Sequence, residues 1–290
     1  MVELMRPWHY GKNLLVLVPL FFSGQLLDAP LKLRMTLAGF VSMCLVSSSV
    51  YAINDCADAK ADRHHSGKQF RPVASGRVKP VQALILAAIL AAAAVGILFL
   101  AGAPLTAMAL LACYVAMNVG YSVLGLKDVP ICDVTIIAFG FVLRVLYGAL
   151  LSQTPASGWL LLTVMAGSYY MALGKRRNEL QRAQSQAVRP VLGRYTQSFL
   201  SRNMYMFLTL VIVFYALWSV DAQTISRYGH PYTVLSVPLV VLLSMHYSLD
   251  VERDADGDPI EVILHEKKLI CLGIAYVGLM LLLIYAKGAV

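Results

Sequence analysis

Nine long apolar stretches, separated by short polar segments, run through the sequence. Because an α-helix needs about 20 apolar residues to cross the hydrocarbon core of a bilayer, each stretch predicts a membrane-spanning helix. The first is the weakest, because Pro19 interrupts it, and a tight turn at residues 102–104 separates the third from the fourth. The predicted spans lie near residues 13–27, 35–54, 81–101, 104–122, 129–150, 158–174, 203–220, 232–249 and 268–286.

The polar segments between the spans predict an orientation. If the N-terminus lies in the cytoplasm, 19 of the 24 Lys and Arg residues fall in cytoplasmic segments and four fall outside. Cytoplasmic loops of membrane proteins carry an excess of basic residues, so this distribution favours a cytoplasmic N-terminus. The remaining basic residue, Arg144, lies inside a predicted span together with Asp133.

The composition agrees with a helical membrane protein. Of the 290 residues, 59% are hydrophobic and 14% are charged, whereas an average globular chain has about 45–50% and about 25%. We therefore expect one all-α, polytopic integral-membrane domain over residues 1–290, in the cell inner (plasma) membrane. The net charge of +8 mainly sets orientation, so no nucleic-acid partner is expected. The five cysteines are scattered without metal-ligand spacing. The sequence leaves the oligomeric state open.

Acidic residues gather on the predicted cytoplasmic side, and four polar residues share one helix face at the end of the second span. Asn54, Asp58 and Asp62 recur at every fourth residue, and Asp55 lies on the same face. We call these four residues the acid stripe. Carboxylates this close repel one another unless a cation neutralises them, and Mg²⁺ is commonly held by carboxylates together with substrate phosphates. The stripe therefore predicts an Mg²⁺ site; a solvated helix end is the alternative.

Basic residues follow the acid stripe in the same loop. Lys68, Arg71 and Arg77 surround a Gly-containing turn, and they are placed to bind phosphate oxygens that the metal leaves uncovered. The alternative is a basic cytoplasmic loop that only sets topology. The acidic residues favour the phosphate site, because topology alone does not require them.

The pattern Asn54-Asp55-x-x-Asp58-x-x-x-Asp62, followed by Lys68-x-x-Arg71-Pro72-x-Ala-Ser-Gly76, resembles the signature of the UbiA-type prenyltransferase superfamily. The nine predicted spans and the cytoplasmic N-terminus agree with that superfamily. The resemblance implies a nine-helix bundle that binds a diphosphate donor through Mg²⁺ and holds an isoprenoid chain in a lipid-facing groove.

The chain departs from the superfamily at the end of the sixth span. Where a second Asp-rich motif is expected, the sequence has Gly174-Lys175-Arg176-Arg177-Asn178-Glu179. A basic cluster suits a second phosphorylated substrate better than a neutral aromatic ring; a topology signal with Lys175 paired to Glu179 is the alternative. This cluster, together with Arg6-Pro7-x-x-Tyr10-x-Lys12-Asn13 and with Asp133 followed by Arg144, resembles the decaprenyl-phosphate phosphoribosyltransferase branch.

That resemblance implies transfer of a 5-phosphoribosyl group from phosphoribosyl diphosphate to a polyprenyl (decaprenyl) phosphate, releasing diphosphate, in cell-wall arabinan precursor synthesis. Mg²⁺ would be held by Asn54, Asp55, Asp58 and Asp62, with the three aspartates as the catalytic residues. Arg6 and Lys12 would hold the lipid phosphate, and for Arg144 an internal ion pair or carbonyl clamp is an equal alternative. The expected substrate-binding residues are Arg6, Lys12, Asn54, Lys68, Arg71, Arg77, Lys127, Arg144, Lys175, Arg176, Arg177 and Glu179.

Two other functions are compatible with the sequence. A conventional superfamily member would transfer a prenyl chain from a polyprenyl diphosphate to an aromatic acceptor, in a quinone or haem-type pathway, but without the second acidic motif. A transporter would use Asp133 and Arg144 as a midplane gate, although the sequence shows no two matching halves. A further acidic loop after the eighth span is either a lid with secondary ligands or a plain acidic turn; its acidic residues include Asp250, Asp254, Asp256 and Asp258.

Overall fold

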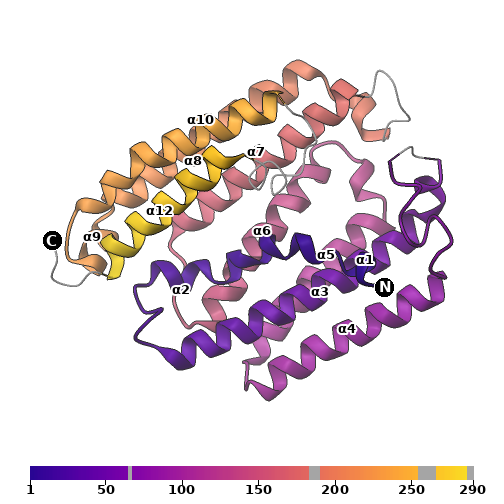
Figure 1. Ribbon diagram of the computed structural model, residues 1–290, viewed down its shortest axis with the longest axis horizontal. Coiled ribbons are helices and arrows are strands. Elements are labelled where there is room, and N and C mark those ends of the chain that lie inside the picture. The colour runs from indigo at the N-terminus through magenta and orange to yellow at the C-terminus, as the bar shows by residue number, and fades with distance from the viewer. Residues whose placement is uncertain (65–66, 183–189, 254–265, 286–290) are drawn as a thin grey trace.

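The chain folds into a bundle of long helices, seen in a computed structural model (Figure 1). The structure describes every residue except 65–66, 183–189, 254–265 and 286–290. Within these described ranges there is no β-strand, which confirms the predicted all-α class. The long helices are α3 (Pro30–Asp62), α4 (Pro80–Leu100), α5 (Leu105–Val123), α6 (Cys132–Leu151), α7 (Gly158–Arg182), α8 (Gln197–Val220), α10 (Val237–Arg253) and α12 (Lys267–Tyr285).

Short helices connect and flank the long ones. They are α1 (Val2–Met5), α2 (Val18–Phe22), α9 (Ala222–Tyr228) and the 3-10 helices η1 (Pro7–Val16), η2 (Leu126–Asp128), η4 (Pro190–Arg194) and η5 (Tyr232–Ser236). Several of them lie beside the ends of long helices, and they carry some of the residues that form the sites described below.

Seven helical segments of the described chain are long and apolar enough to cross a membrane: α3, α4, α5, α6, α8, Tyr232–Glu252 and α12. Helix α7 has 25 residues, which is length enough, but its polar residues and basic end keep it out of this group. Several apolar helices of this length make the chain a multi-pass membrane protein. The count of nine spans and the cytoplasmic N-terminus stay predictions.

The first predicted span, residues 13–27, differs from the expected single helix. Residues Pro7–Val16 form η1, and a separate helix, α2, follows. Pro19 explains the break, because inside a helix its ring would clash with the carbonyl four residues earlier, whereas in the first turn its missing N–H costs nothing. Gly148 on α6 lets η1 lie close, since a Cβ atom there would stand 2.0 Å from the Val16 carbonyl oxygen. The N-terminal segment is thereby packed onto the bundle.

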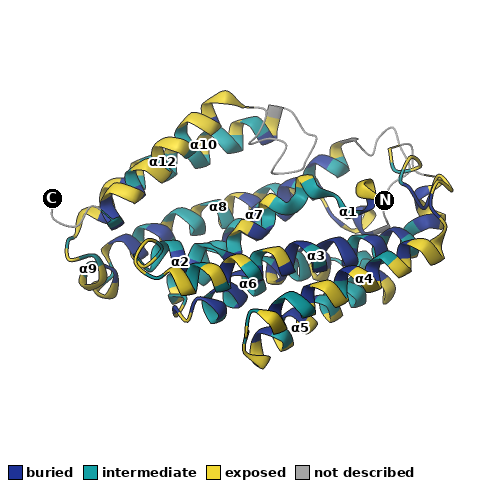
Figure 2. Ribbon diagram, turned by 60° about the horizontal axis from the view of Figure 1, so that its bottom comes forward, coloured by how far each residue is buried: buried dark blue, intermediate teal, exposed yellow. Residues whose placement is uncertain are grey.

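Helix α3 packs against α4, α5 and α6, and α7 packs against α6 and α8. Ser42 and Ser49 on α3 donate hydrogen bonds to the α4 carbonyls of Ala94 and Ala87, at 3.0 and 2.9 Å. Small residues and hydrogen bonds of this kind hold helices together where lipid replaces water. The outer side of α4 exposes apolar side chains such as Ile89, as expected for a lipid-facing surface (Figure 2).

The bundle has two ends. Helix α1 and the C-terminal ends of α3 and α7 lie at one end, which we call the stripe end (Figure 1). Helices α2 and α9, with the N-terminal end of α7, lie at the other end, which we call the α9 end. The acid stripe and most of the other predicted site residues therefore share the stripe end.

Candidate active site

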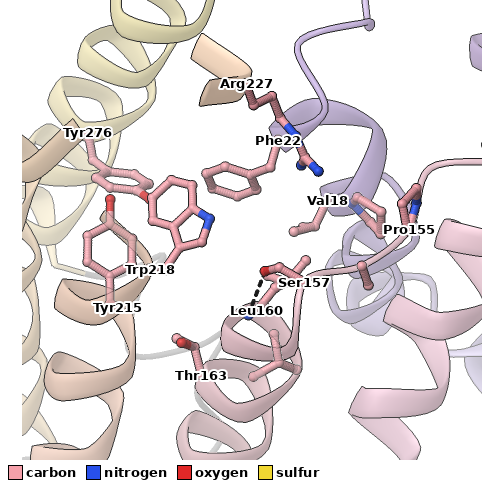
Figure 3. A pocket seen from close by; sticks show the side chains of 13 residues that line it. Val18, Phe22, Pro155, Ser157, Leu160, Thr163, Tyr215, Trp218, Arg227 and Tyr276 are labelled. Atoms are coloured by element: carbon pink, nitrogen blue, oxygen red, sulfur yellow. Dashed lines mark hydrogen bonds between the residues drawn. The ribbon is translucent and has the colours of Figure 1, made fainter. Parts of the chain in front are cut away.

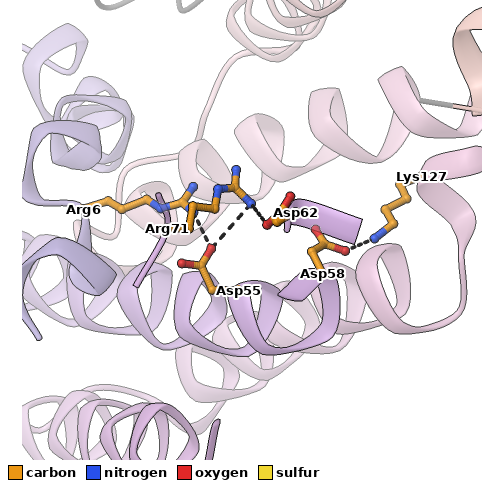
Figure 4. Close-up of polar contacts among 6 residues, drawn as sticks. All are labelled: Arg6, Asp55, Asp58, Asp62, Arg71 and Lys127. Carbon is orange, nitrogen blue, oxygen red and sulfur yellow. Dashed lines mark hydrogen bonds and ion pairs between the residues drawn. The ribbon is translucent and has the colours of Figure 1, made fainter. Parts of the chain in front are cut away.

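The acid stripe occupies the last turns of α3. Figure 4 shows its three aspartates, Asp55, Asp58 and Asp62, on this helix beside the basic residues that contact them. Basic residues from separate segments meet its carboxylates. Arg6, at the junction of α1 and η1, places Nη2 2.5 Å from Asp55 Oδ1. Lys127, in η2, forms an ion pair with Asp58. The fold thus joins residues that are 49 and 69 positions apart in the chain.

Arg71 links two carboxylates of the stripe. Its Nη1 lies 2.7 Å from Asp62 Oδ2 and 3.6 Å from Asp55 Oδ1. Both aspartates are buried, whereas the Arg71 side chain is 25% exposed. A single guanidinium between two carboxylates offsets the repulsion that the sequence pattern predicts. Arg71 therefore lies where its side chain can reach both the stripe and solvent.

Arg6 owes its position to an unusual backbone conformation. Its φ of 49° and ψ of 60° lie in the left-handed region, which costs a non-glycine residue about 1–3 kcal/mol. The guanidinium carbon stands 5.1 Å from the centre of the Tyr51 ring on α3. Ser48 donates a hydrogen bond to the Met5 carbonyl at 2.8 Å, and the Tyr10 hydroxyl is 2.9 Å from Ser48 Oγ. These contacts hold the N-terminal segment, and with it Arg6, against the stripe.

The stripe also contains oxygen atoms without partners. Asn54 Oδ1 and Asp55 Oδ2 are buried and accept no hydrogen bond from the described part of the chain, and an unpaired buried acceptor costs about 1–3 kcal/mol. Amide and carboxylate oxygens are the donors that Mg²⁺ prefers. The described residues contain no group of three His, Cys, Asp or Glu side chains arranged to hold a metal by themselves. The donor chemistry therefore fits Mg²⁺, with substrate phosphates required to complete its shell.

The middle residue of the basic triplet lies in a buried network. Arg176 Nε is 2.6 Å from Asp133 Oδ2, its Nη1 is 2.8 Å from Glu179 Oε2, and its Nη2 donates to the Tyr121 hydroxyl at 3.3 Å. Asp133 is completely buried, and its other oxygen accepts a hydrogen bond from Tyr195 at 2.6 Å. Each of the three Arg176 nitrogens thus has a protein partner, and the fold directs this side chain into the bundle.

Tyr195 is a member of this network that the sequence analysis missed. Its hydroxyl also accepts a hydrogen bond from the Ile131 amide at 2.6 Å. Burial, followed by the hydrogen bond to Asp133, raises the pKa of Tyr195 well above its ordinary value, so the hydroxyl remains a donor to the carboxylate. A tyrosine between apolar stretches carries no sequence signal for such a role, because tyrosines are also common at membrane interfaces.

The other two residues of the basic triplet, Lys175 and Arg177, have different surroundings from Arg176. Arg177 Nε and Nη1 are buried and have no hydrogen-bond partner among the described residues. Lys175 is half-buried on the same helix, and Glu179 pairs with Arg176 three residues earlier. Of the triplet, Arg177 is therefore the residue with donor groups left for a ligand.

Arg144 is held by neutral acceptors. Its three nitrogens donate to Asn13 Oδ1, the Gly140 carbonyl and the Tyr114 hydroxyl, each at 2.8 Å. The guanidinium also lies over the rings of Tyr114 and Phe141, at 4.8 and 5.3 Å. This arrangement is the carbonyl clamp that the sequence analysis kept as an alternative for Arg144. Asp133 does not pair with Arg144; its partner is Arg176. The clamp ties α6 to η1 and α5.

Several predicted residues lie at the edge of the site. Arg77 forms an exposed ion pair with Glu3 at 2.8 Å and donates to the Phe70 carbonyl at 2.6 Å, so the structure does not bring it to the stripe. Lys12 Nζ lies 3.3 Å from Nδ1 of His9. Lys68 precedes Arg71 by one turn of the same loop.

The acidic loop is described only in part. Asp250 lies on α10. Asp254, Asp256 and Asp258 fall outside the described residues. The lid and the acidic-turn interpretations of this loop stay predictions.

Comparisons with known proteins place this site in a family. Residues 16–264 match the UbiA prenyltransferase family. The chain is 34% identical to the decaprenyl-phosphate phosphoribosyltransferase of Mycolicibacterium smegmatis, over 96% of this chain and 90% of that protein. It is 32% identical to the protein of the same name from Corynebacterium glutamicum, over 98% and 86%. The fold is similar to a UbiA homolog from Archaeoglobus fulgidus bound to GPP and Mg²⁺, with a TM-score of 0.71, 14% identity and 98% coverage of both chains.

Proposed function

Because the chain belongs to the UbiA prenyltransferase family, we propose that it transfers the 5-phosphoribosyl group of phosphoribosyl diphosphate to decaprenyl phosphate or a similar polyprenyl phosphate. The observation that carries the proposal is the charge at the stripe end. Three carboxylates meet three basic side chains, Arg6, Arg71 and Lys127, and α7 adds basic residues where a second acidic motif would stand. Such a site suits two phosphorylated substrates, and the names of the two relatives support the same reaction.

The reaction exchanges one C–O bond for another. An oxygen of the lipid phosphate attacks C1 of the ribose, the bond from C1 to the diphosphate oxygen breaks, and diphosphate leaves with the electron pair. The lipid phosphate is already anionic near neutral pH, so no general base is required. Arg6, Arg71 and Lys127 would offset the repulsion between the two phosphorylated substrates, and Arg71 and Lys127 would bind the leaving diphosphate.

Mg²⁺ is the proposed cofactor, and Asn54, Asp55, Asp58 and Asp62 would hold it. When bound, the ion supplies Lewis-acid stabilisation of the charge that develops on the leaving group. The unpartnered oxygens of Asn54 and Asp55 support this assignment. Arg177, Lys175 and Lys68 are proposed as further phosphate ligands, because they lie at the same end of the bundle.

We further propose that the stripe end faces the cytoplasm across the inner (plasma) membrane. Phosphoribosyl diphosphate is water-soluble, and the distribution of basic residues favours this orientation. Residues 1–290 would act as one integral-membrane domain, with Arg6 and Lys12 placed to receive the lipid phosphate from the bilayer. The product would serve cell-wall arabinan precursor synthesis.

The two alternative functions have less support. Prenyl transfer to an aromatic acceptor requires metal ligands on α7, where the one acidic residue in the region of the expected motif, Glu179, is bound to Arg176. A transporter gate at Asp133 and Arg144 would need these charges to change partners. Both are held by several buried contacts within the bundle.

The proposal is tested with membranes that contain the protein, Mg²⁺, phosphoribosyl diphosphate labelled in the ribose, and decaprenyl phosphate. We expect label to enter the organic phase only when all components are present, and to stay in water with EDTA. A parallel reaction with labelled prenyl diphosphate and an aromatic acid provides the contrast. Prenylation of the acid without ribosyl transfer would overturn the proposal.

A further inference from the structure

A cavity lies at the α9 end, away from the charged residues of the proposed reaction. Its volume is about 220 Å³. Helices α2, α7, α8, α9 and α12 contribute to its walls, which are mostly apolar and aromatic, as Figure 3 shows for Val18, Phe22, Leu160, Tyr215 and Tyr276. A designed apolar cavity of about 150 Å³ holds benzene, so this one has room for part of a hydrocarbon chain. Two of the helices that line it, α2 and α9, lie at the opposite end of the bundle from the end of α3 that carries the acid stripe (Figure 1).

Most polar side chains that line the cavity already have partners. These are Ser157, whose Oγ accepts from the Leu160 amide at 3.1 Å, Thr163, whose Oγ1 donates to the Trp159 carbonyl at 2.7 Å, and Tyr215, whose hydroxyl is 2.7 Å from Ser236 Oγ. Each contact uses part of the hydrogen-bonding capacity of these hydroxyl groups, and the rest of the lining is mostly apolar. The lining therefore favours a ligand whose body is apolar.

Two donors remain, and both face the cavity. Trp218 is 8% exposed, and its indole nitrogen points into the open space in Figure 3. The Arg227 guanidinium stands at the edge of the same space. Among the described residues, neither group has a hydrogen-bond or ion-pair partner. A buried indole N–H normally finds an acceptor, and a guanidinium binds phosphate through charge-assisted hydrogen bonds.

We propose that this cavity binds an anionic phospholipid of the membrane leaflet at the α9 end. An acyl chain fills the space between Phe22, Leu160 and Trp218, and the phosphate accepts hydrogen bonds from Arg227 and from the Trp218 indole. A bilayer-embedded chain meets such lipids at high local concentration, and the positive charge at the mouth selects for a negative head group. The charged residues of the proposed transfer reaction lie at the stripe end, so the two sites can be tested separately.

Tryptophan fluorescence provides a direct test, because the chain has three tryptophans. Replacing Trp8 and Trp159 with Phe leaves Trp218 as the single reporter. The purified variant is titrated with phosphatidylglycerol or phosphatidylcholine whose acyl chains carry bromine, a short-range quencher. We expect saturable quenching by both lipids, with an apparent affinity about tenfold higher for phosphatidylglycerol. Both lipids offer the phosphate, but phosphatidylcholine adds a cationic choline group that Arg227 repels.

Two further variants locate the selectivity. Arg227→Gln should remove the preference for phosphatidylglycerol. Arg34→Gln is the matched control, since Arg34 is an exposed arginine at the start of α3, away from the cavity, and it should keep the preference. Equal quenching by the two lipids, or an unchanged preference in Arg227→Gln, would overturn the proposal.

Competition identifies the source of the phosphate. Unlabelled phosphatidylglycerol should restore the fluorescence at lower concentration than decaprenyl phosphate does. If decaprenyl phosphate is the stronger competitor, the occupant is the proposed lipid substrate, and the phospholipid assignment is wrong. Transfer activity is measured separately, so failure of this test leaves the proposed reaction untouched.

Discussion

Two clusters of paired acidic and basic side chains lie at the stripe end. They differ in how many of their buried polar atoms have hydrogen-bond or ion-pair partners. In the buried network, Arg176 and Asp133 are at most 2% exposed, and both carboxylate oxygens of Asp133 have partners. In the acid stripe, the pairs to Asp58 and Asp62 are about a quarter exposed on the basic side. The stripe also keeps two buried oxygens, on Asn54 and Asp55, that have no hydrogen-bond partner within the described ranges.

The difference indicates which cluster is structural and which awaits a ligand. A buried ion pair whose groups are all hydrogen-bonded adds little net stability, but removing one partner is costly, because a charge then remains buried alone. Buried oxygens without partners, by contrast, carry a desolvation cost that a bound cation or ligand would offset. Similar Asp–Arg pairs therefore have different roles, and substitutions should separate the two clusters by what they damage.

The largest effect is expected in the buried network. Asp133→Asn removes the fully buried carboxylate that pairs with Arg176, leaving only the partly exposed Glu179, and should lower the free energy of unfolding by about 3–5 kcal/mol. Thermal unfolding in detergent measures this loss. Asp128→Asn, the same change five residues earlier at a half-buried position, is the control and should unfold like the wild type. A wild-type unfolding midpoint for Asp133→Asn would contradict a structural role for the network.

The second prediction concerns the stripe. Asp58→Asn should keep the wild-type unfolding midpoint but lose at least about a hundredfold in transfer rate. An amide is a poorer ligand for a hard cation, and metal stabilisation of a leaving group contributes several kcal/mol. Rates are measured by label transfer in membranes with and without EDTA. Full activity in EDTA would show that the stripe is not a metal site.

The third prediction compares arginines from the two clusters. Arg71→Lys keeps the charge but loses the planar donor geometry, so the KM for phosphoribosyl diphosphate should rise about tenfold or more. Arg177→Lys should act in the same direction. Arg176→Lys should instead lower the unfolding midpoint and leave KM unchanged. If Arg176→Lys raises KM at wild-type stability, the buried network belongs to the substrate site.

The smallest effect is expected at the edge of the site. Arg77 and Glu3 are each 54% exposed in their ion pair, and such surface pairs contribute about 0–1 kcal/mol. Arg77→Gln should therefore change stability little and KM by less than about twofold. Thermal unfolding in detergent measures the stability change, and steady-state kinetics measures the KM. A tenfold rise in KM would return Arg77 to the phosphate site that the sequence suggested.

The sequence predicted the all-α class, the helical acid stripe and the grouping of charge at one end. Those features depend on local periodicity and on residue type, both of which can be read along the chain. It could not predict that Asp133 pairs with Arg176 and not Arg144, because both arginines are compatible with the pattern and only the packing of α6 against α7 decides. The break at Pro19 was visible, but its outcome, a 3-10 helix held against Gly148, depends on tertiary contact.

Manganese binding monitored by electron paramagnetic resonance tests the central claim most directly. Mn²⁺ is titrated into the purified protein with diphosphate present, and bound ion is read from the loss of the free Mn²⁺ signal. We expect one diphosphate-dependent site in the wild type and in Arg176→Lys, and loss of that site in Asp58→Asn. Retention of the site in Asp58→Asn, or its absence from the wild type, would contradict the assignment of the acid stripe as the metal and phosphate centre.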